Sequence, residues 1–300
     1  MKYMKELKKN MTNFNVMLAK EFDPMNRRLD IKNFIQPKLD GVRCYITKDG
    51  AFSRNHKPFK NCKHITTTLQ SFFKDYPDRI LDGELYNHKF KNDFNKIISL
   101  VKKQKPTQAD RFESAMYLQF HCYDQFIPDS NIDTHQSLSN AILFQKRSER
   151  ITGYKEYYKW RSIKTVPTYE VSSDTEIKDY HNEFKDLGYE GSILRYNTPY
   201  ETKRSNNLMK IKDWSDTEAT ITGYVEGKGK FANGLGKWLA VDKDGREVEI
   251  PWPTLTIENR KQMWQARKKY IGKLLTFEFF ERTPAGAYRF PRAKTIRNYE

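Results

Sequence analysis

The chain has 300 residues, 37% of them hydrophobic and 14% aromatic, which excludes an intrinsically disordered protein and allows one large domain or two ordinary ones. Its 54 Lys and Arg residues outnumber its 38 Asp and Glu residues, and the formal charge of +16 favours a nucleic-acid partner over a merely solubilising surface. No apolar stretch could cross a bilayer, no signal peptide is recognisable and three widely spaced cysteines fit a reducing compartment, so we expect an intracellular protein with no membrane partner.

The predicted elements begin with an amphipathic helix that runs to about Lys20, because Met4, Leu7 and Met11 share a helical face and Asp23-Pro24 breaks the pattern. A Lys-Asp-Gly turn at 48–50 predicts a hairpin between two strands. Apolar periodicity predicts further helices over 64–73, 94–101, 139–151 and 175–187. Strands are expected around 34–36 and over 42–46, 51–54, 79–86, 116–126, 191–195 and 208–212.

After residue 212 the pattern changes to short strands joined by Gly- and Lys-rich turns. The strands are expected over 217–225, 238–241, 247–250 and 274–280, with one helix over 257–271. Several short strands with a single helix are typical of a small OB-type barrel. We therefore expect an α+β protein with antiparallel sheets and helices in a first domain, 1–213, and a small β-barrel in a second domain, 214–300.

The most informative segment is Lys38-Leu39-Asp40-Gly41-Val42-Arg43, a strand end followed by a tight Gly turn. The turn would present the Lys38 amine at the mouth of a pocket, and Arg43 could reach a ribose or a phosphate. A nucleophilic lysine must lose its proton, which burial and neighbouring cations favour. On these six residues alone, an ordinary surface turn is an equally good interpretation.

Further charged residues alternate along predicted strands. Asp82 and Glu84 are two residues apart and so share a strand face, where they suit a magnesium ion or a ribose hydroxyl. Glu190 stands at another strand start, where a metal role is possible. Lys210 and Lys212 also share a face, which is tolerable if an anion lies between them. Taken singly, these segments could equally be a solvated turn or a charged edge strand.

Six separated segments, in this order, resemble motifs of the covalent nucleotidyltransferase superfamily and, within it, of the small viral and phage ATP-dependent DNA ligases. The segments are 38–43, 53–55, 81–84, 120–124, 190–195 and 204–212. The resemblance runs from about Met17 to the C-terminus, and it is specific as a set although no single segment is. It implies an adenylation (nucleotidyltransferase) domain followed by an OB-fold domain.

The resemblance implies that Lys38, with Asp40 beside it, carries AMP received from ATP. Lys210, Lys212 and Mg²⁺ would neutralise the phosphate, and Glu190 and Glu84 would support the metal. Tyr123 would stack on adenine with Ile193 on its other face, although both are also credible core residues. The remaining residues implied to bind the nucleotide are Gln36, Arg43, Arg54 and Arg204, and Glu84 joins them.

The resemblance extends to nucleic-acid contacts, because the implied substrate is nicked duplex DNA bound by a monomer. Arg54 would contact the 5′-phosphate of the nick, and Lys228 and Lys230 lie in a Gly-rich segment suited to phosphate contacts. Arg289 and Arg292 lie where such ligases carry their last basic motif. Here Arg-Ala-Lys at 292–294 replaces the Arg-x-Asp-Lys pattern of many relatives, so the residue that serves this step is open.

Three other functions remain open. An RNA ligase and an mRNA capping guanylyltransferase share the lysine chemistry, and a catalytically silent nucleic-acid-binding protein would share the basic surface. The segment 227–291 favours DNA over RNA ligation, and the presence of every expected residue from Lys38 to Lys212 argues against a silent protein. An NAD⁺-dependent ligase is disfavoured, because the cysteine-rich zinc segments of those enzymes are missing.

Overall fold

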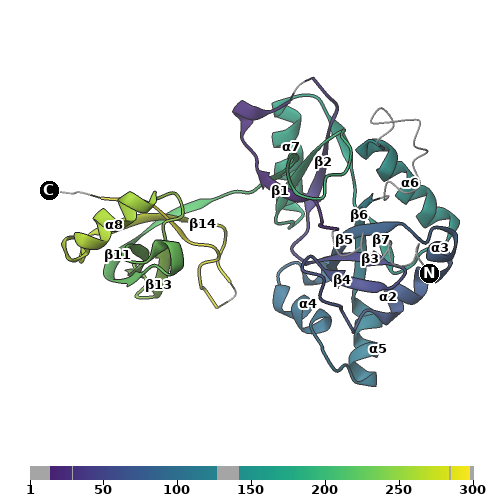
Figure 1. The fold of residues 1–300 in the computed structure, drawn as a ribbon, viewed down its shortest axis with the longest axis horizontal. Coiled ribbons are helices and arrows are strands. Elements are labelled where there is room, and N and C mark those ends of the chain that lie inside the picture. The colour runs from purple at the N-terminus through teal and green to yellow at the C-terminus, as the bar shows by residue number, and fades with distance from the viewer. Residues whose placement is uncertain (1–13, 29, 127–141, 284, 298–300) are drawn as a thin grey trace. The chain divides into compact units, whose positions relative to one another are not determined.

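The computed structural model describes residues 14–28, 30–126, 142–283 and 285–297. The chain divides into two compact units, one up to Ile211 and one from Lys212 onward (Figure 1). The expected boundary after Asp213 lies close to this division. In the part of the chain that the structure describes, no helix is both long enough and apolar enough to cross a membrane.

The first unit contains two mixed sheets, and the first of them carries the Lys38 strand. Over the described residues its strand order is β1-β10-β9-β2-β8, and only β1 and β10 pair in parallel. The strands are β1 (Leu18–Glu21), β2 (Asn33–Lys38), β8 (Tyr169–Val171), β9 (Gly191–Tyr196) and β10 (Arg204–Ile211).

One face of this sheet is apolar, and the other carries polar residues. Ile35, Leu194 and Met209 lie in a buried cluster with Ile177 and Phe184 of α7 (Asp174–Asp186), which covers that face. Alternate residues of the same strands point the other way, because side chains alternate along a strand. The alternation therefore places the Lys38 side chain on the face that α7 does not cover.

The second sheet has the strand order β4-β3-β5-β6-β7, with β6 and β7 parallel. Its strands are β3 (Val42–Thr47), β4 (Gly50–Ser53), β5 (Ile80–Tyr86), β6 (Gln119–Phe126) and β7 (Ile163–Thr165). Its apolar face forms the largest buried cluster with the surrounding helices. The helices are α2 (Lys63–Thr68), α3 (Gln70–Asp75), α4 (Phe94–Val101), α5 (Gln108–Tyr117) and α6 (Phe144–Tyr157).

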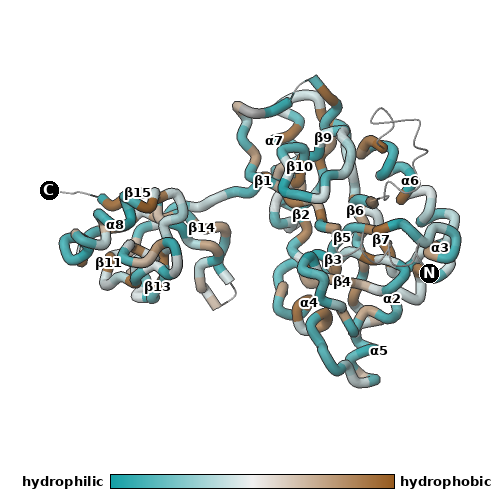
Figure 2. The backbone as a smooth tube through the Cα atoms, in the orientation of Figure 1, coloured by the Kyte–Doolittle hydropathy of each residue, from teal (hydrophilic) through white to brown (hydrophobic). Residues whose placement is uncertain are grey.

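The polar faces of the two sheets are turned toward each other. Arg195 of β9 donates from Nη1 to Asp124 of β6 over 2.9 Å, and both side chains are buried. Hydrophobic segments, brown in Figure 2, recur along the strands and helices of both units between hydrophilic ones. The first unit therefore has apolar outer layers under helices and a charged layer between its sheets.

The second unit is one antiparallel sheet of order β13-β12-β11-β14-β15 over the described residues, and β13 and β15 approach each other to close it into an OB-like barrel. Trp238, Ile250 and Phe277 are fully buried at its centre. Its strands are β11 (Ser215–Glu226), β12 (Leu235–Asp242), β13 (Glu247–Pro251), β14 (Leu274–Phe279) and β15 (Arg292–Ile296). Short helical segments complete it: η4 (Gly229–Phe231), α8 (Ile257–Gln265) and η5 (Arg267–Tyr270).

Three predictions of secondary structure were wrong. The helix expected up to Lys20 is strand β1 over Leu18–Glu21, because β10 offers an open edge for pairing; residues 1–13 lie outside the described part. Met116, expected in a strand, lies in the unpredicted helix α5, which begins at a capping box between Thr107 and Asp110. The helix expected to reach Ile271 ends at Gln265 and continues as the 3₁₀ turn η5.

Smaller differences concern boundaries and short elements. The helix expected over 64–73 is interrupted at Leu69, which separates α2 from α3. The helix expected over 139–151 spans Phe144–Tyr157, and residues 139–141 fall outside the described residues. Strands β7, β8 and β15 were not predicted; the first two are only three residues long.

Candidate active site

Lys38 is the last residue of β2, and it faces Glu190 immediately before β9. The Lys38 ammonium pairs with the Glu190 carboxylate, and the two backbones are joined by a 3.0 Å bond from Glu190 N to Lys38 O. The Lys38 side chain is 20% exposed and that of Glu190 only 5%. The amine is thus held in a largely enclosed place beside a carboxylate.

Two glycines hold the chain closely around Lys38. Gly191 pairs with Lys38 in the sheet and has φ of 150°, and a Cβ there would lie 2.3 Å from the Ile211 carbonyl oxygen. Gly41, in the turn after Lys38, lies so close to β5 that a Cβ would be 2.6 Å from Leu85 O and 2.7 Å from Glu84 Cγ. Only glycine allows these approaches, which bring the Lys38 turn against the Glu84 strand.

The expected nucleotide residues of the first sheet form one row across it. Lys210 of β10 pairs in register with Ile193 of β9, and Ile193 pairs with Gln36 of β2. Cross-strand partners point to the same face, and Lys38 follows Gln36 by two residues, so all four share the face turned toward the second sheet. Lys210 Nζ lies 2.9 Å from Glu21 Oε1, a contact that we had not predicted.

The second sheet contributes Arg43, Asp82 and Glu84. Arg43 binds the buried Asp82 with two bonds, Nε to Oδ1 at 2.8 Å and Nη2 to Oδ2 at 2.6 Å, and Nη2 also donates to Met17 O at 2.9 Å. Tyr200 donates its hydroxyl to the same Asp82 carboxylate over 2.7 Å. Asp82 therefore anchors Arg43, while Glu84 is the carboxylate of this strand that remains next to the lysine turn.

Glu84 is the most strongly perturbed carboxyl group of the site. Burial raises its pKa to about 8, against the opposing effects of Arg43 and Lys38, and the nearby Glu190 also raises it. Such a carboxyl tends to hold its proton near neutral pH and would ionise when a cation arrives. Perturbed groups of this kind concentrate at functional sites.

Tyr123 and Gln36 belong to a buried network between the sheets. The guanidinium carbons of Arg43 and Arg195 each lie 5.1 Å from the centroid of the Tyr123 ring. Arg195 Nε donates to Gln36 Oε1 at 2.6 Å, and Asp124 receives bonds from both Arg195 and Arg147. The network links Gln36, on the strand that carries Lys38, to the strand that carries Tyr123.

The other expected residues of the first unit lie further out. Asp40 is partly buried in the turn between β2 and β3, and Arg54 is exposed in the turn after β4. Arg204 is exposed at the start of β10 and donates to Ala19 O at 2.5 Å. Among the described residues, Arg54 and Arg204 do not belong to the hydrogen-bonded group around Lys38.

The remaining expected residues belong to the second unit. Lys212 Nζ lies 4.4 Å from the centre of the Phe280 ring. Lys228 and Lys230 are exposed at η4, whereas Arg289 pairs with Glu281 and Arg292 with Glu278. Arg292 also stacks on Trp214, with 3.6 Å from its guanidinium carbon to the ring centre. The division of the chain therefore places Lys212 in the second unit and Lys210, its expected partner on the same strand, in the first.

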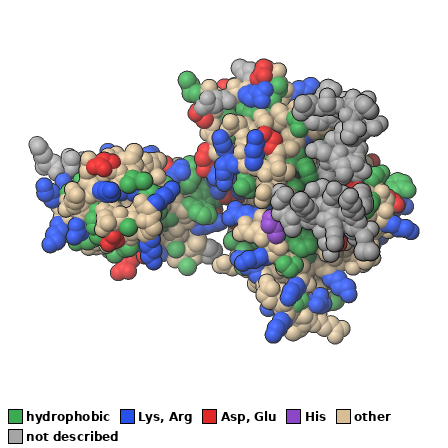
Figure 3. All heavy atoms as spheres, viewed as in Figure 1, with side chains coloured by type: hydrophobic (Ala, Val, Ile, Leu, Met, Phe, Trp, Pro, Cys, Tyr) green, Lys and Arg blue, Asp and Glu red, His purple; other side chains and the backbone are tan. Residues whose placement is uncertain are grey.

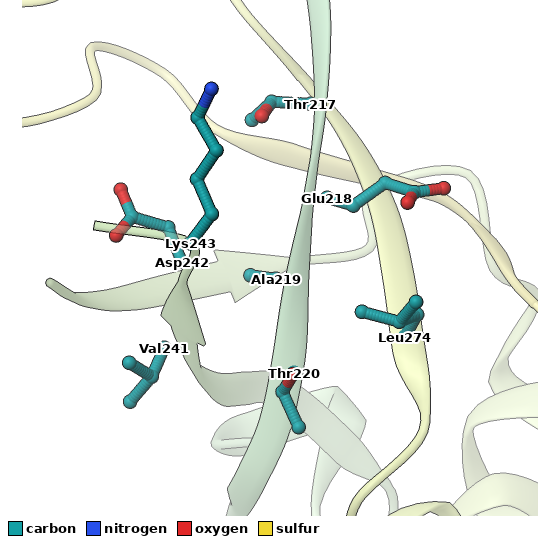
Figure 4. Close-up of a pocket in the computed structure, with 8 residues that line it drawn as sticks. All are labelled: Thr217, Glu218, Ala219, Thr220, Val241, Asp242, Lys243 and Leu274. Carbon is teal, nitrogen blue, oxygen red and sulfur yellow. The ribbon is translucent and has the colours of Figure 1, made fainter. Parts of the chain in front are cut away.

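One hollow of the second unit contains none of the expected site residues among its described lining (Figure 4). It is lined by Thr217, Glu218, Ala219, Thr220, Val241, Asp242, Lys243 and Leu274. Within the described residues, no three His, Cys, Asp or Glu side chains are grouped as a ready metal site. Glu84 and Glu190 offer two carboxylates, so a Mg²⁺ ion there would need oxygen atoms of a substrate or of water as its other ligands.

Sequence reasoning missed Glu21 and the buried arginines. Arg195 and Asp124 lay inside recognised segments, but nothing local shows that they bind each other, and Arg147 lies outside every segment. Glu21 was hidden because its segment was predicted to follow a helix. The available signal was an acidic residue within a strand, as Asp124 is between Tyr123 and Gln125.

The fold and the site together define the class: two facing sheets around an enclosed lysine, followed by an OB-like barrel, are the architecture of a covalent nucleotidyltransferase with an adenylation domain and an OB-fold domain. Residues 16–212 match the family model described as ATP dependent DNA ligase domain, and residues 226–297 match that of the DNA ligase OB-like domain. The chain belongs to the ATP-dependent DNA ligase domain family.

Individual relatives agree with the family. A DNA ligase of African swine fever virus is 28% identical over 269 residues, which cover 83% of this chain and 59% of the viral protein, so the chain spans about three fifths of that relative. A DNA ligase of Haemophilus influenzae is 29% identical over 254 residues, 84% of this chain and 82% of that protein. A solved structure of a Lig E DNA ligase shares the fold, with a TM-score of 0.75, 21% identity and coverage of 94% of this chain and 99% of that one.

Proposed function

We propose that this chain seals nicks in duplex DNA with ATP, through AMP bound covalently to Lys38. The observation that supports this most directly is the enclosed Lys38 amine, beside Glu190 and on one sheet face with Gln36, Ile193 and Lys210. The family and the DNA ligases among its relatives support the same reaction.

The proposed reaction has three transfers. Lys38 Nζ, after losing a proton, attacks the α-phosphorus of ATP, a P–N bond forms and pyrophosphate leaves. The AMP then passes to the 5′-phosphate of the nick, which frees Lys38. Finally the 3′-hydroxyl loses its proton to solvent and its oxygen attacks that activated phosphate, so that a phosphodiester forms and AMP leaves. In such transfers positioning and charge neutralisation provide most of the catalysis.

The residues of the first unit fit these needs. Lys210 would bind phosphate oxygens, Tyr123 and Ile193 would contact adenine, and Glu84 would bind the ribose or a metal. Glu190 and Glu84 would hold Mg²⁺, which supplies positive charge against the phosphate oxygens. Glu190 also pairs with the Lys38 ammonium group and would restrict the position of the amine.

The second unit would supply cations to the DNA. Lys228 and Lys230 are exposed in a Gly-rich segment, and basic side chains, blue in Figure 3, are distributed over the visible faces of both units. Phosphate contacts by such residues are independent of sequence and weaken with salt. We propose that the protein acts on nicked duplex DNA as a monomer, inside the cell.

The test is incubation with Mg²⁺ and α-labelled ATP or GTP, followed by denaturation and detection of labelled protein, and then nick-joining assays on DNA and RNA duplexes. We expect a label from ATP alone that disappears in Lys38→Ala but persists in Lys32→Ala, an exposed lysine just before the same strand. A label from GTP alone would indicate capping, and joining of RNA alone an RNA ligase. A protein without label after prior treatment with pyrophosphate would be a silent binding protein.

A further inference from the structure

Glu21, the last residue of β1, is a charged member of the site that no recognised segment contains. Its Oε1 lies 2.9 Å from Lys210 Nζ. It also completes the row described above, because the register runs Glu21, Lys210, Ile193, Gln36 across four neighbouring strands. Glu21 therefore lies on the face that carries Lys38, at the sheet edge beside the lysine expected to hold the phosphate.

An irregularity in β1 brings Glu21 to this position. Leu18 and Ala19 pair with Arg204 and Ser205, but Lys20 and Glu21 pair with Met209 and Lys210. Continuation of the first register would place Glu21 opposite Asn207, three residues before Lys210. A register shift by an odd number of residues exchanges the faces to which the side chains of a strand point. The new register is held by a 3.0 Å bond from Phe22 N to Lys210 O. Interruptions of a ladder are commonly retained where they aim a side chain.

The two lysines of this face each have their own carboxylate, because Glu190 pairs with Lys38 and Glu21 with Lys210. The environments differ. Glu190 is 5% exposed, whereas the Glu21 side chain is 50% exposed and that of Lys210 is 30% exposed. A solvated carboxylate holds an ammonium group too weakly to keep a phosphate away, but strongly enough to restrict a long, flexible side chain.

We propose that Glu21 is a positioning residue that orients Lys210 toward the α-phosphate during AMP transfer to Lys38. An ammonium group has three N–H donors, so one bond to Glu21 leaves the others for phosphate oxygens. The proposal rests on the proposed function and adds to it a residue supplied by the N-terminal edge strand. It differs from two simpler roles, a competitor that blocks Lys210 and a surface pair that only stabilises the edge of the sheet.

Single-turnover adenylation of wild type, Glu21→Gln and Glu21→Asp tests this proposal. For Glu21→Gln we expect the maximal rate to fall about fivefold, since exposed ion pairs contribute up to about 1 kcal/mol, while the ATP concentration at half-maximal rate stays within about twofold. Glu21→Asp, which keeps the carboxylate, should retain more of the rate. In a Lys210→Ala background, Glu21→Gln should cause no further loss, because the effect passes through Lys210.

Glu170→Gln is the matched control, since it removes an exposed ion pair with Lys32 on the same sheet, away from Lys38. This substitution should leave the adenylation rate and the ATP concentration at half-maximal rate unchanged. Melting temperatures should show that all variants are folded. An unchanged maximal adenylation rate in Glu21→Gln overturns the proposal, whether or not the ATP concentration at half-maximal rate is lower. A loss of rate that Glu21→Gln still causes in the Lys210→Ala background overturns it too. If the wild-type protein forms no AMP adduct, the proposed function is wrong as well as the role of Glu21. If wild type and Glu21→Gln form the adduct at the same rate, only the role of Glu21 is overturned.

Discussion

At the scale of single residues, the site depends on carboxylates whose surroundings differ. Asp82 is buried and accepts two hydrogen bonds from Arg43. Glu190 is largely enclosed and forms an ion pair with Lys38. Glu84 lies near Arg43 and Lys38, yet burial still raises its pKa to about 8. A buried carboxyl group whose ionisation the fold disfavours is a candidate functional residue, because perturbed groups of this kind concentrate at functional sites.

We therefore predict that Glu84→Gln stabilises the nucleotide-free protein at alkaline pH while it slows adenylation. Because the folded-state pKa lies above the ordinary value of 4.5, ionisation favours the unfolded chain increasingly from about pH 4.5 to about pH 8. The gain in unfolding free energy should stay below about 1 kcal/mol at pH 5 and reach on the order of a few kcal/mol at pH 8.5, since one pKa unit is about 1.4 kcal/mol. Urea unfolding with a chelator present measures it.

The control for this prediction is Glu183→Gln, an exposed residue of α7. Its unfolding free energy should follow that of wild type at both pH values. A pH-independent gain in Glu84→Gln would contradict the assignment of a buried, reluctantly ionised carboxyl. A variant that keeps the wild-type adenylation rate would remove Glu84 from the site.

A second prediction at this scale concerns Gly191. Its φ is 150° and a Cβ there would lie only 2.3 Å from Ile211 O, so alanine must displace β9 or β10. We expect Gly191→Ala to lower the unfolding free energy by roughly 2 kcal/mol or more, as backbone strain at special positions does. Gly153→Ala, in α6 with open space around it, should raise stability by up to about 1 kcal/mol. Equal effects of the two substitutions, measured by thermal unfolding, would contradict this.

At the scale of elements, the sheets could be predicted where the signal is local. Lys38 at a strand end, the glycine turn after it and helix 94–101 all follow from short stretches of sequence, and α4 spans those residues. Pairings between distant segments left no such signal. The slip in β1 that brings Glu21 to Lys210 and the bond between Arg195 and Asp124 depend on which strands become neighbours, so they were found only in the fold.

The layer between the two sheets leads to a prediction at the same scale. Asp124 is fully buried and is shared by Arg147 and Arg195, which come from α6 and β9. Asp124→Asn should lower the unfolding free energy by about 3–5 kcal/mol, because it leaves buried guanidinium groups without their counter-charge. Asp179→Asn, exposed on α7, is the control and should change it little. A loss below about 1 kcal/mol in urea unfolding would mean that the network does not hold the sheets together.

At the scale of the whole molecule, the chain combines an adenylation domain with an OB-fold domain, and the proposed reaction needs residues of both. Lys38, Lys210 and the residues proposed to contact adenine belong to the first unit, and Lys212 and the exposed cations of η4 to the second. The net charge of +16 predicts an affinity for DNA that falls steeply with salt. The separation of roles predicts that DNA affinity and adenylation can be altered independently.

We expect the double substitution of Lys228 and Lys230 by alanine to weaken binding to nicked DNA and to reduce the slope of log affinity against log salt by about 1.8, close to 0.9 for each lost phosphate contact. Adenylation of Lys38 without DNA should be unaffected. Lys102→Ala, an exposed lysine of the first unit, is the control and should preserve the slope. Fluorescence anisotropy at several salt concentrations gives the slope, and an unchanged slope in the double variant would exclude these lysines from the DNA contact.

The central claim is that Lys38 carries the nucleotide, and peptide mapping by mass spectrometry tests it most directly. After reaction with ATP and Mg²⁺, we predict that the peptide containing Lys38 gains the mass of one AMP, and that added pyrophosphate removes it. An AMP attached to any other residue, or no adduct on a folded protein already cleared of nucleotide, would contradict the account.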